Sequence, residues 1–263
     1  MEKNYYITKT EQDIMRAIRG ADIVSVDELR KLFPNLTAEM LWKALSSLSK
    51  KGYLTRLKKG LYLVNEEPGS PSIKSPYRIA LALFPGYIAF SSALRLYGLL
   101  EYEPFTIFVA TPRKSGERAV GEYTIKAVAL GEKATGMTLK DGVYTSTLAK
   151  TFFDCFYKPP HCGGYSEITK ALYEVEKLDW DEFLGYFERF ASDSLCQRTG
   201  YVMELLRDEL GVDVPGRVLD YLRGRVKSWT KLVPTFPSCG RGSKEWKVID
   251  NLGKEKILGW AYG

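Results

Sequence analysis

Residues 37–64 read TAEMLWKALSSLSKKGYLTRLKKGLYLV. In the first half, apolar residues recur at the i, i+3, i+4, i+7 spacing of one buried helix face: Leu41, Ala44, Leu45 and Leu48. Thr37 is placed to cap this helix, and Gly52 is placed to end it. Two β-prone runs follow at 53–57 and 61–64, joined by Lys58-Lys59-Gly60 as a tight turn. The stretch therefore predicts a helix followed by a β-hairpin.

Two shorter helices are predicted before this stretch. Residues 10–20, TEQDIMRAIRG, begin with Thr10 as a capping residue and end at Gly20. Residues 25–32, SVDELRKL, form the second, and Pro34 with Asn35 then forces a turn. Helix, helix, tight turn, helix and hairpin is the order of a winged helix-turn-helix. We therefore expect such a DNA-binding domain over residues 1–66.

Residues 66–76, EEPGSPSIKSP, are typical of a domain linker, because three prolines and a glycine lie among serines. We place the linker at 67–76 and a C-terminal domain at 77–263. In that domain, periodicity predicts helices at 77–84, 91–100, 148–157, 165–176, 179–191, 195–210 and 216–225, and strands at 105–110, 123–130, 142–146 and 246–249. The expected fold class is α+β: an N-terminal winged helix-turn-helix joined to a larger mixed C-terminal domain with a small β-sheet and several helices.

Charge is distributed unevenly along the chain, whose net charge is +6. Residues 1–66 hold 12 Lys and Arg against 8 Asp and Glu, residues 67–211 hold 16 against 19, and residues 212–263 hold 10 against 5. Two basic ends thus flank an acidic middle. A basic excess in a small domain suits a polyanion such as nucleic acid, although an ordinary solvated surface would also explain it.

The helix predicted from Thr37 is the candidate for entering the DNA major groove, where short polar and cationic side chains read base edges. Lys43 and Ser46 are the best candidates for base contacts. Glu39 either accepts from a cytosine amino group or interacts with the positive helix N-terminus. Trp42 either packs on the DNA backbone or supports the helix against the wing, and Lys50 and Lys51 are expected on phosphates. The whole predicted face comprises Thr37, Glu39, Trp42, Lys43, Ser46, Ser47 and Lys50.

The hairpin turn carries three cations, Arg56, Lys58 and Lys59. On a two-stranded wing these side chains can reach a phosphate backbone or a minor groove. The alternative is a solvated hairpin whose charges keep an edge strand soluble.

A second basic segment lies near the C-terminus, where aromatic residues alternate with cations. It contains Arg217, Arg223, Arg225, Lys227, Lys231, Arg241, Lys244 and Lys247, interleaved with Trp229, Phe236 and Trp246. Such a segment either binds nucleic acid by charge and stacking or docks on the acidic middle of the same chain. The sequence leaves both interpretations open.

Motifs for catalysis or metal binding are weak. The four cysteines form no CxxC pair, and His161 is the single histidine, so His161 with Cys162 more simply belongs to a loop than to a zinc site. Scarce Asn and Gln hint at a thermophile, where buried disulfides inside a cell become possible. Residues 239–246, CGRGSKEW, lack the spacing of a phosphate loop. Asp220, Glu245 and Lys247 resemble the loose set with which nucleases bind magnesium, a pattern that is common by chance.

We therefore expect no enzyme activity and assign no catalytic residue, metal ligand or cofactor. The chain has no run of about 18 uninterrupted apolar residues, and its start, MEKNYYITKTEQD, lacks the apolar core of a signal peptide. A cytoplasmic protein with no membrane partner is expected.

Several stretches, in this order, resemble the AbiEi-type antitoxins, also described as predicted transcriptional regulators of viral defence systems. They are RLKKGLYLV (56–64), GYIAFSSALRLYGLLEYEP (86–104) followed by FTIFVAT (105–111), TSTLAKTFFDCF (145–156), RTGYVMELL (198–206) and KEWKVIDNL (244–252). The resemblance implies an N-terminal winged helix that represses its own operon, with Lys43, Lys58 and Lys59 on DNA. It also implies a C-terminal domain that opposes a nucleotidyltransferase-like toxin, without necessarily forming a stable complex with it, as in type IV toxin-antitoxin (abortive infection) systems.

Three functions are thus in competition. The first is a DNA-binding repressor with antitoxin activity, whose partners are the double-stranded DNA of its own promoter and a toxin. The second is a stand-alone regulator whose C-terminal domain forms a homodimer or senses a ligand. The third is a magnesium-dependent nuclease.

Overall fold

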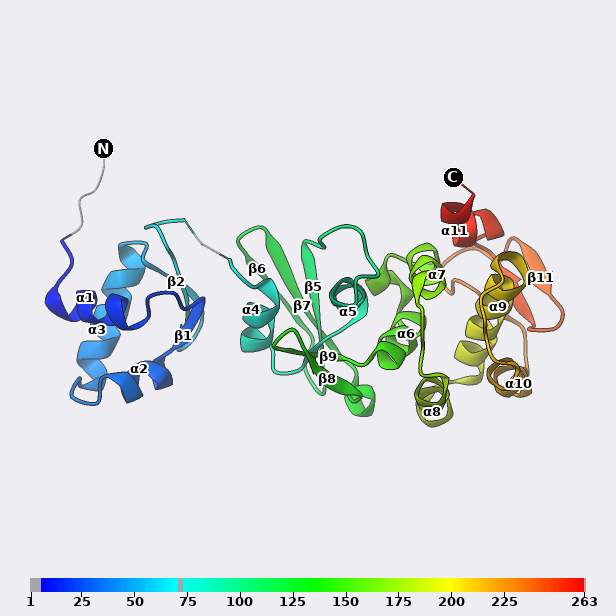
Figure 1. Cartoon of the computed structure of the whole chain (residues 1–263), viewed down its shortest axis with the longest axis horizontal. Coiled ribbons are helices and arrows are strands. Elements are labelled where there is room, and N and C mark those ends of the chain that lie inside the picture. The colour runs from blue at the N-terminus through cyan, green and yellow to red at the C-terminus, as the bar shows by residue number, and fades with distance from the viewer. Residues whose placement is uncertain (1–5, 71–72, 263) are drawn as a thin grey trace. The chain divides into compact units, whose positions relative to one another are not determined.

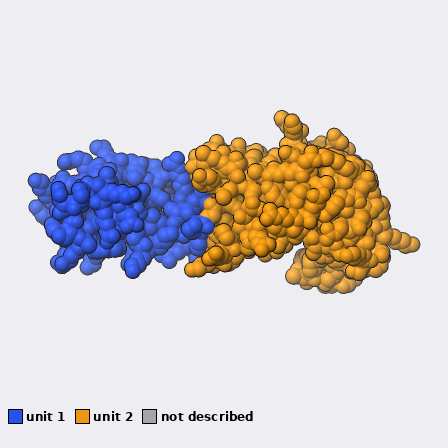
Figure 2. All heavy atoms as spheres, turned by 90° about the horizontal axis from the view of Figure 1, so that it is seen from below, with its two compact units in different colours: residues 1–85, 117–125 blue, residues 86–116, 126–263 orange. Residues whose placement is uncertain are grey.

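The computed structural model describes residues 6–70 and 73–262. The chain divides into two compact units, residues 1–85 with 117–125 and residues 86–116 with 126–263 (Figure 2). The first unit thus extends beyond the predicted segment 1–66 and takes in the predicted linker 67–76. Residues 71 and 72 of that linker, and the first five residues used in the signal-peptide argument, lie outside the described part.

The first unit begins with three helices and a small sheet (Figure 1). In chain order these are α1 (Lys9–Ala17), β1 (Ile23–Ser25), α2 (Val26–Leu32), α3 (Ala38–Lys50), β2 (Leu54–Lys58) and β3 (Leu61–Val64). The strands pair antiparallel in the order β1-β3-β2. The predicted helices and hairpin are present, whereas the three-residue strand β1 was not predicted.

The core of this unit is built on the predicted leucine face of α3. Leu41, Ala44, Leu45 and Leu48 are all buried, and they belong to one cluster with residues of α1, α2 and the sheet. Thr37 caps α3 as expected, because its hydroxyl accepts a hydrogen bond from Met40 N at 3.2 Å. Burial of these apolar side chains is the main force that holds the helices on the sheet.

Helix α1 begins two residues earlier than predicted. Its cap is Thr8 and not Thr10, because Thr8 and Glu11 form a reciprocal capping box. Thr8 N donates to Glu11 Oε2 at 2.7 Å, and Glu11 N donates to Thr8 Oγ1 at 3.3 Å. The Thr-x-x-Glu spacing satisfies two backbone donors at once, which Thr10 with Asp13 does not do here.

The start of the predicted linker is packed against the end of α3. Gly69 N donates to Gly52 O at 2.9 Å, and a Cβ at Gly52 would lie 2.5 Å from Gly69 N. Gly52 also has a φ of +82°, so both its backbone conformation and this close approach require glycine. Helix α4 (Pro76–Leu83) completes this part of the first unit.

A six-stranded sheet, most of which belongs to the second unit, has the order β6-β7-β5-β4-β9-β8 (Figure 1). The strands are β4 (Tyr87–Ile88), β5 (Thr106–Thr111), β6 (Gly116–Val120), β7 (Tyr123–Ala129), β8 (Met137–Lys140) and β9 (Val143–Ser146), with α5 (Phe90–Leu96) between β4 and β5. Strand β4 is antiparallel to β5 and parallel to β9. Strands β5, β7 and β9 were predicted; the short or polar strands β4, β6 and β8 were not.

Helices make up most of the remainder of the second unit. They are α6 (Leu148–Tyr157), α7 (Tyr165–Glu174), α8 (Trp180–Phe190), α9 (Asp193–Leu210), α10 (Gly216–Gly224) and α11 (Lys254–Leu258), with the 3-10 turns η1 (Gly131–Lys133), η2 (Pro159–Cys162) and η3 (Gly259–Ala261). Helix α6 is central: every residue from 149 to 156 is buried, and Phe153 contacts Phe187 of α8 with ring centroids 5.2 Å apart.

The last forty residues are more regular than predicted. They form a second sheet of order β10-β12-β11, from β10 (Thr230–Lys231), β11 (Arg241–Ser243) and β12 (Val248–Asp250), followed by α11. The α+β class is therefore confirmed. No helix within residues 6–70 and 73–262 combines the length and apolarity that a bilayer span requires.

Candidate functional site

Helix α3 presents an open polar face opposite its buried leucines. Thr37, Glu39, Lys43, Ser46 and Lys50 are all exposed on this helix, as predicted. Lys43 Nζ lies 2.7 Å from Glu39 Oε1, and both side chains are about three-quarters exposed, at 75% and 76%. Water screens such a pair strongly, so its contribution to stability is small and either group can exchange its partner for a ligand.

One large exposed side chain of this helix was missed. Met40 is 48% exposed although it is apolar. Apolar side chains on a groove-reading helix contact the thymine methyl group. The sequence already indicated its exposure, because Met40 lies outside the i, i+3, i+4, i+7 positions of the buried leucine face.

Two members of the predicted face turn away from the open surface. Trp42 is half-buried and packs against the core cluster, which favours the supporting role over contact with DNA. Ser47 is half-buried and its side chain is hydrogen-bonded to Glu11 of α1.

Lys51 is not the phosphate contact that we predicted. Its side chain is only 13% exposed, and Nζ donates to Glu11 Oε2 at 2.7 Å. Burial alone would raise the pKa of Glu11, but the bonds from Lys51, Ser47 and Thr8 outweigh burial and lower the pKa to about 2. Lys51 therefore joins α1 to the end of α3, a contact across 40 residues that local sequence does not reveal.

In the hairpin, a β-bulge determines which side chains face outward. The register shifts between Arg56 and Lys58, so Leu57 is buried at 2% exposure while its neighbours Arg56 and Lys58 are exposed. Gly60, with a φ of +77°, closes the turn after the exposed Lys59. Within the described residues, neither Arg56 nor Lys59 forms an ion pair or a side-chain hydrogen bond. Both cations are available to a ligand.

Lys58 has a different environment from the other two hairpin cations. Its Nζ donates to Ala82 O at 2.6 Å and to Leu83 O at 3.0 Å, at the C-terminal end of α4. A cation there satisfies free carbonyls and interacts favourably with the helix dipole. A phosphate contact by Lys58 would have to replace these bonds, so Arg56 and Lys59 are the stronger candidates.

Half of the eight cations in the basic C-terminal segment pair with acids of the same chain. Arg217 bonds to Asp181, and Arg225 and Lys227 both bond to Asp193, at 2.6 and 2.7 Å. Trp246 is fully buried, and its Nε1 donates to a glutamate of α9 at 2.6 Å. Of the two interpretations, docking on the acidic middle is the one that these contacts support.

The carboxylates of the loose nuclease set pair with an arginine of the same chain. Arg223 bridges Asp220 and Glu245 at 3.3 and 2.7 Å, and Lys247 Nζ donates to Lys227 O. Among the described residues there is no cluster of three or more His, Cys, Asp or Glu that could hold a metal ion.

His161 and Cys162 lie in separate environments despite their adjacency. The His161 ring packs on Phe90 and Phe108, with centroids 5.1 and 5.0 Å away, and burial, with help from nearby lysines, lowers its pKa to about 4. The Cys162 Sγ lies 2.7 Å from Cys155 Sγ, and both cysteines are buried. Burial therefore keeps the histidine neutral at pH 7, and the described partner of the Cys162 sulfur is Cys155.

A charged pair is buried inside the second unit. Lys150 Nζ bonds to Asp154 Oδ1 one turn along α6, and both side chains are 0% exposed. Burial lowers the pKa of Lys150 and raises that of Asp154 to about 6, each against the opposing effect of its partner. The ammonium also lies 5.3 Å from the Phe153 ring centroid, while Asp154 Oδ2 has no hydrogen-bond partner among the described residues.

The fold is shared with a solved structure. The crystal structure of the RV2827C protein from Mycobacterium tuberculosis superposes with a TM-score of 0.70 at 16% sequence identity, over 98% of this chain and 96% of that one. No family model matches the chain, and no curated protein matches it. At this identity, the likeness concerns the fold alone.

Other features were missed although part of their signal was readable. Lys150 and Asp154 stand four residues apart in a helix that is otherwise apolar, a spacing that places them on one face. The capping box of α1 is visible as Thr-x-x-Glu. No local pattern indicated the cavity that four separate segments of the second unit enclose.

Proposed function

We propose that this chain binds duplex DNA through a winged helix-turn-helix formed by α1 to β3, with α3 in the major groove and the β2–β3 hairpin as the wing. The element order α1-β1-α2-α3-β2-β3 and the strand order β1-β3-β2 support this assignment. Five residues, 33–37, connect α2 to α3. A short turn between two helices is the arrangement with which this motif presents its second helix to a groove.

One observation carries the proposal: α3 buries one face completely and leaves the other polar and open. Lys43, Ser46 and Lys50 project from this face, and Arg56 and Lys59 are unpaired on the following hairpin. Base edges are read by the helix, and phosphates are bound by cations that release counterions. The proposed DNA-contacting set is therefore Thr37, Glu39, Met40, Lys43, Ser46, Lys50, Arg56 and Lys59.

We further propose that this binding represses the chain's own operon and that the remainder of the chain acts as an antitoxin without itself being an enzyme. The support is the resemblance to AbiEi-type antitoxins, which extends from the hairpin to residue 252. The stand-alone regulator remains the second candidate, and the cavity described below is the observation that favours it.

Titration of the chain's own promoter with full-length protein, followed by fluorescence anisotropy at several salt concentrations, tests DNA binding. Arg56→Ala with Lys59→Ala should weaken binding to every duplex and reduce the salt slope by about one to two. Lys43→Ala should mainly reduce preference for the operator over unrelated DNA, by about 5- to 100-fold.

The matched control is Arg113→Ala with Lys114→Ala, which removes two exposed cations from the second unit. This variant should bind like the wild type. Equal DNA affinity of the wild type, both double variants and Lys43→Ala would place the DNA interface elsewhere. An equal loss of affinity in the two double variants would mean that net charge alone explains the effect.

The antitoxin proposal has a separate test. A nucleotidyltransferase-like reading frame beside this gene should arrest growth when expressed alone, and co-expression of this chain should restore growth. The Arg56→Ala, Lys59→Ala variant should still restore growth while it loses repression of a promoter fusion. Absence of such a neighbouring frame, or failure to restore growth, favours the stand-alone regulator.

A further inference from the structure

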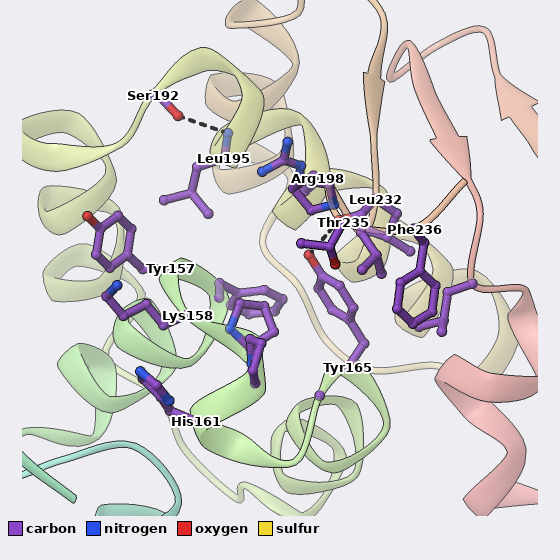
Figure 3. A pocket seen from close by; sticks show the side chains of 17 residues that line it. Tyr157, Lys158, His161, Tyr165, Ser192, Leu195, Arg198, Leu232, Thr235 and Phe236 are labelled. Carbon is purple, nitrogen blue, oxygen red and sulfur yellow. Dashed lines mark hydrogen bonds between the residues drawn. The ribbon is translucent and has the colours of Figure 1, made fainter. Parts of the chain in front are cut away.

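A cavity of about 590 Å³ lies within the second unit. Its walls come from the end of α6, from η2 and the start of α7, from the first turns of α9, and from residues 232–236 (Figure 3). This volume falls in the range of small-molecule sites, about 300 to 1,000 Å³. The cavity is therefore large enough for a ligand with a ring system.

The walls are apolar and stiff. Phe156, Leu195 and Leu232 are buried residues of the lining, and Phe236, which is 43% exposed, also belongs to it. Three lining prolines, at 159, 160 and 234, restrict the backbone on two sides. Aromatic and aliphatic walls of this kind bind an apolar ligand body with little reorganisation.

The charges of the lining have one sign. Lys158 and Arg198 are its cationic groups, and no aspartate or glutamate belongs to it. The lining histidine, His161, is held neutral by burial and packs on other aromatic rings. The cavity thus combines an apolar body with positive charge at its wall.

Arg198 is the most informative of these residues because it has no acidic partner. The other arginines of α9 and α10, Arg207, Arg217 and Arg223, each lie at salt-bridge distance from a carboxylate. Arg198 instead donates Nε to Lys231 O at 2.8 Å and Nη2 to Thr230 Oγ1 at 2.9 Å. Within residues 6–70 and 73–262, no carboxylate lies within 4 Å of it.

These two bonds fix the guanidinium but leave its charge uncompensated. Arg198 is half-buried, and burial lowers its pKa. A partly desolvated cation without a counterion is costly, and a bound anion removes that cost through charge-assisted hydrogen bonds. The Tyr165 hydroxyl, which donates to Leu232 O at 3.3 Å, and Thr235 belong to the same lining and add polar groups to it.

We propose that this cavity binds a small amphiphilic carboxylate with an aromatic body, whose carboxylate is bound by Arg198. The ring system occupies the space lined by Phe156, Leu195 and Phe236. This site is independent of the proposed DNA interface, since it consists entirely of residues of the second unit.

The test compares two probes of nearly identical shape, 1-naphthylacetate and its neutral amide, 1-naphthylacetamide, by calorimetric titration of the full-length chain. The acid should bind at least about tenfold more tightly than the amide. Arg198→Met should weaken binding of the acid by about 10- to 100-fold and leave binding of the amide unchanged. Arg198→Lys should retain part of the preference for the acid, because it keeps the charge.

Two further variants complete the design. Arg217→Met removes the same charge from an arginine outside this cavity and should leave both affinities unchanged. Thr235→Trp, at an exposed lining position, should fill the cavity and weaken binding of both probes. Thermal unfolding of each variant shows whether the fold is intact.

Several results would overturn the proposal: no binding of either probe at millimolar concentration, equal affinity for acid and amide, or unchanged acid binding in Arg198→Met or in Thr235→Trp. The Arg56→Ala, Lys59→Ala variant should bind the acid like the wild type. Failure of the DNA proposal and failure of this one are therefore distinguishable.

Discussion

Replacing Lys150 by Met is expected to lower the free energy of unfolding at pH 7 by about 4 kcal/mol. Both Lys150 and Asp154 are fully buried, so removal of the ammonium leaves a carboxylate in an apolar site without a counterion. The folded variant must therefore protonate Asp154. For a carboxyl group with an unfolded pKa near 3.9, protonation at pH 7 costs about 1.4 kcal/mol for each of roughly three pH units.

This origin of the cost predicts its pH dependence. In Lys150→Met, the folded pKa of Asp154 is raised above its unfolded value, so stability is gained at low pH and lost as pH rises. Between pH 7 and pH 5 the variant should gain about 3 kcal/mol and the wild type about half as much, because the pKa of its paired Asp154 is already raised to about 6, so the deficit should shrink by about 1 to 2 kcal/mol. In Asp154→Leu the remaining Lys150 must lose its proton, its folded pKa is depressed, and its deficit should instead shrink as pH rises from 7 to 9.

The double variant should unfold within about 1 kcal/mol of the wild type, because a buried ion pair replaced by apolar side chains of similar size is often neutral or stabilising. Urea unfolding followed by tryptophan fluorescence measures this, since four of the five tryptophans, at 180, 229, 246 and 260, lie in the second unit. The control is the exposed pair Glu39–Lys43, with the same i,i+4 spacing, where Lys43→Met should cost no more than about 0.5 kcal/mol. The reasoning would be refuted if the losses of unfolding free energy in Lys150→Met and Asp154→Leu added in the double variant, or if both losses changed in the same direction with pH.

Three further predictions concern other contacts. Because the pKa of Glu11 is lowered in the folded state, its carboxylate stabilises the first unit above about pH 4.5, and this stabilisation is lost as pH falls towards 2. Glu11→Gln should therefore reduce the loss of stability at acid pH, measured by the NMR signal of the α3 tryptophan indole. An unchanged pH dependence at acid pH would contradict this. A thiol oxidant such as diamide should join Cys155 to Cys162 in the folded chain, because their sulfurs are 2.7 Å apart, and the intact mass should fall by two hydrogens; free thiols in the treated folded chain, with a disulfide formed only after unfolding, would argue against native proximity. Gly200→Ala should destabilise the protein by about 1–3 kcal/mol, since its Cβ would lie 2.1 Å from a buried tryptophan ring. The control is Gly185→Ala, which adds a Cβ in open space on α8 and should stabilise by up to about 1 kcal/mol in the same urea experiment. Equal effects of the two substitutions would contradict the steric explanation.

Sequence predicted well what local periodicity determines. The leucine spacing of α3 gave both its bounds and its buried face, and the turn residues after Arg56 gave the hairpin. The start of α1 was misplaced because two threonines compete for one cap, and the reciprocal bond of Thr8 with Glu11 decides between them. Strands β1 and β4 were missed because segments of three and two residues carry no measurable alternation.

The candidate sites were predicted less completely, because they depend on contacts between distant residues. Lys50 and Lys51 are equivalent in the sequence, yet Lys50 is exposed and Lys51 is paired with Glu11, 40 residues away. Lys58 and Lys59 differ in the same way, since only Lys58 reaches the end of α4. The charge of a residue is visible in the sequence, but its availability depends on which partner the fold supplies.

The two basic ends of the chain illustrate the consequence for function. Their excess charges are nearly equal, 4 over residues 1–66 and 5 over residues 212–263. Of the ten cations in residues 212–263, Arg217, Arg223, Arg225, Lys227 and Lys254 are paired with acids of the same chain, whereas Arg241, Lys244 and Lys256 are exposed and form no ion pair among the described residues. A cation that is already paired must give up its partner to bind a phosphate, so it contributes less to counterion release on DNA. The DNA proposal therefore rests on the position of the unpaired Lys50, Arg56 and Lys59, on α3 and the following hairpin, and not on the larger excess at the C-terminus.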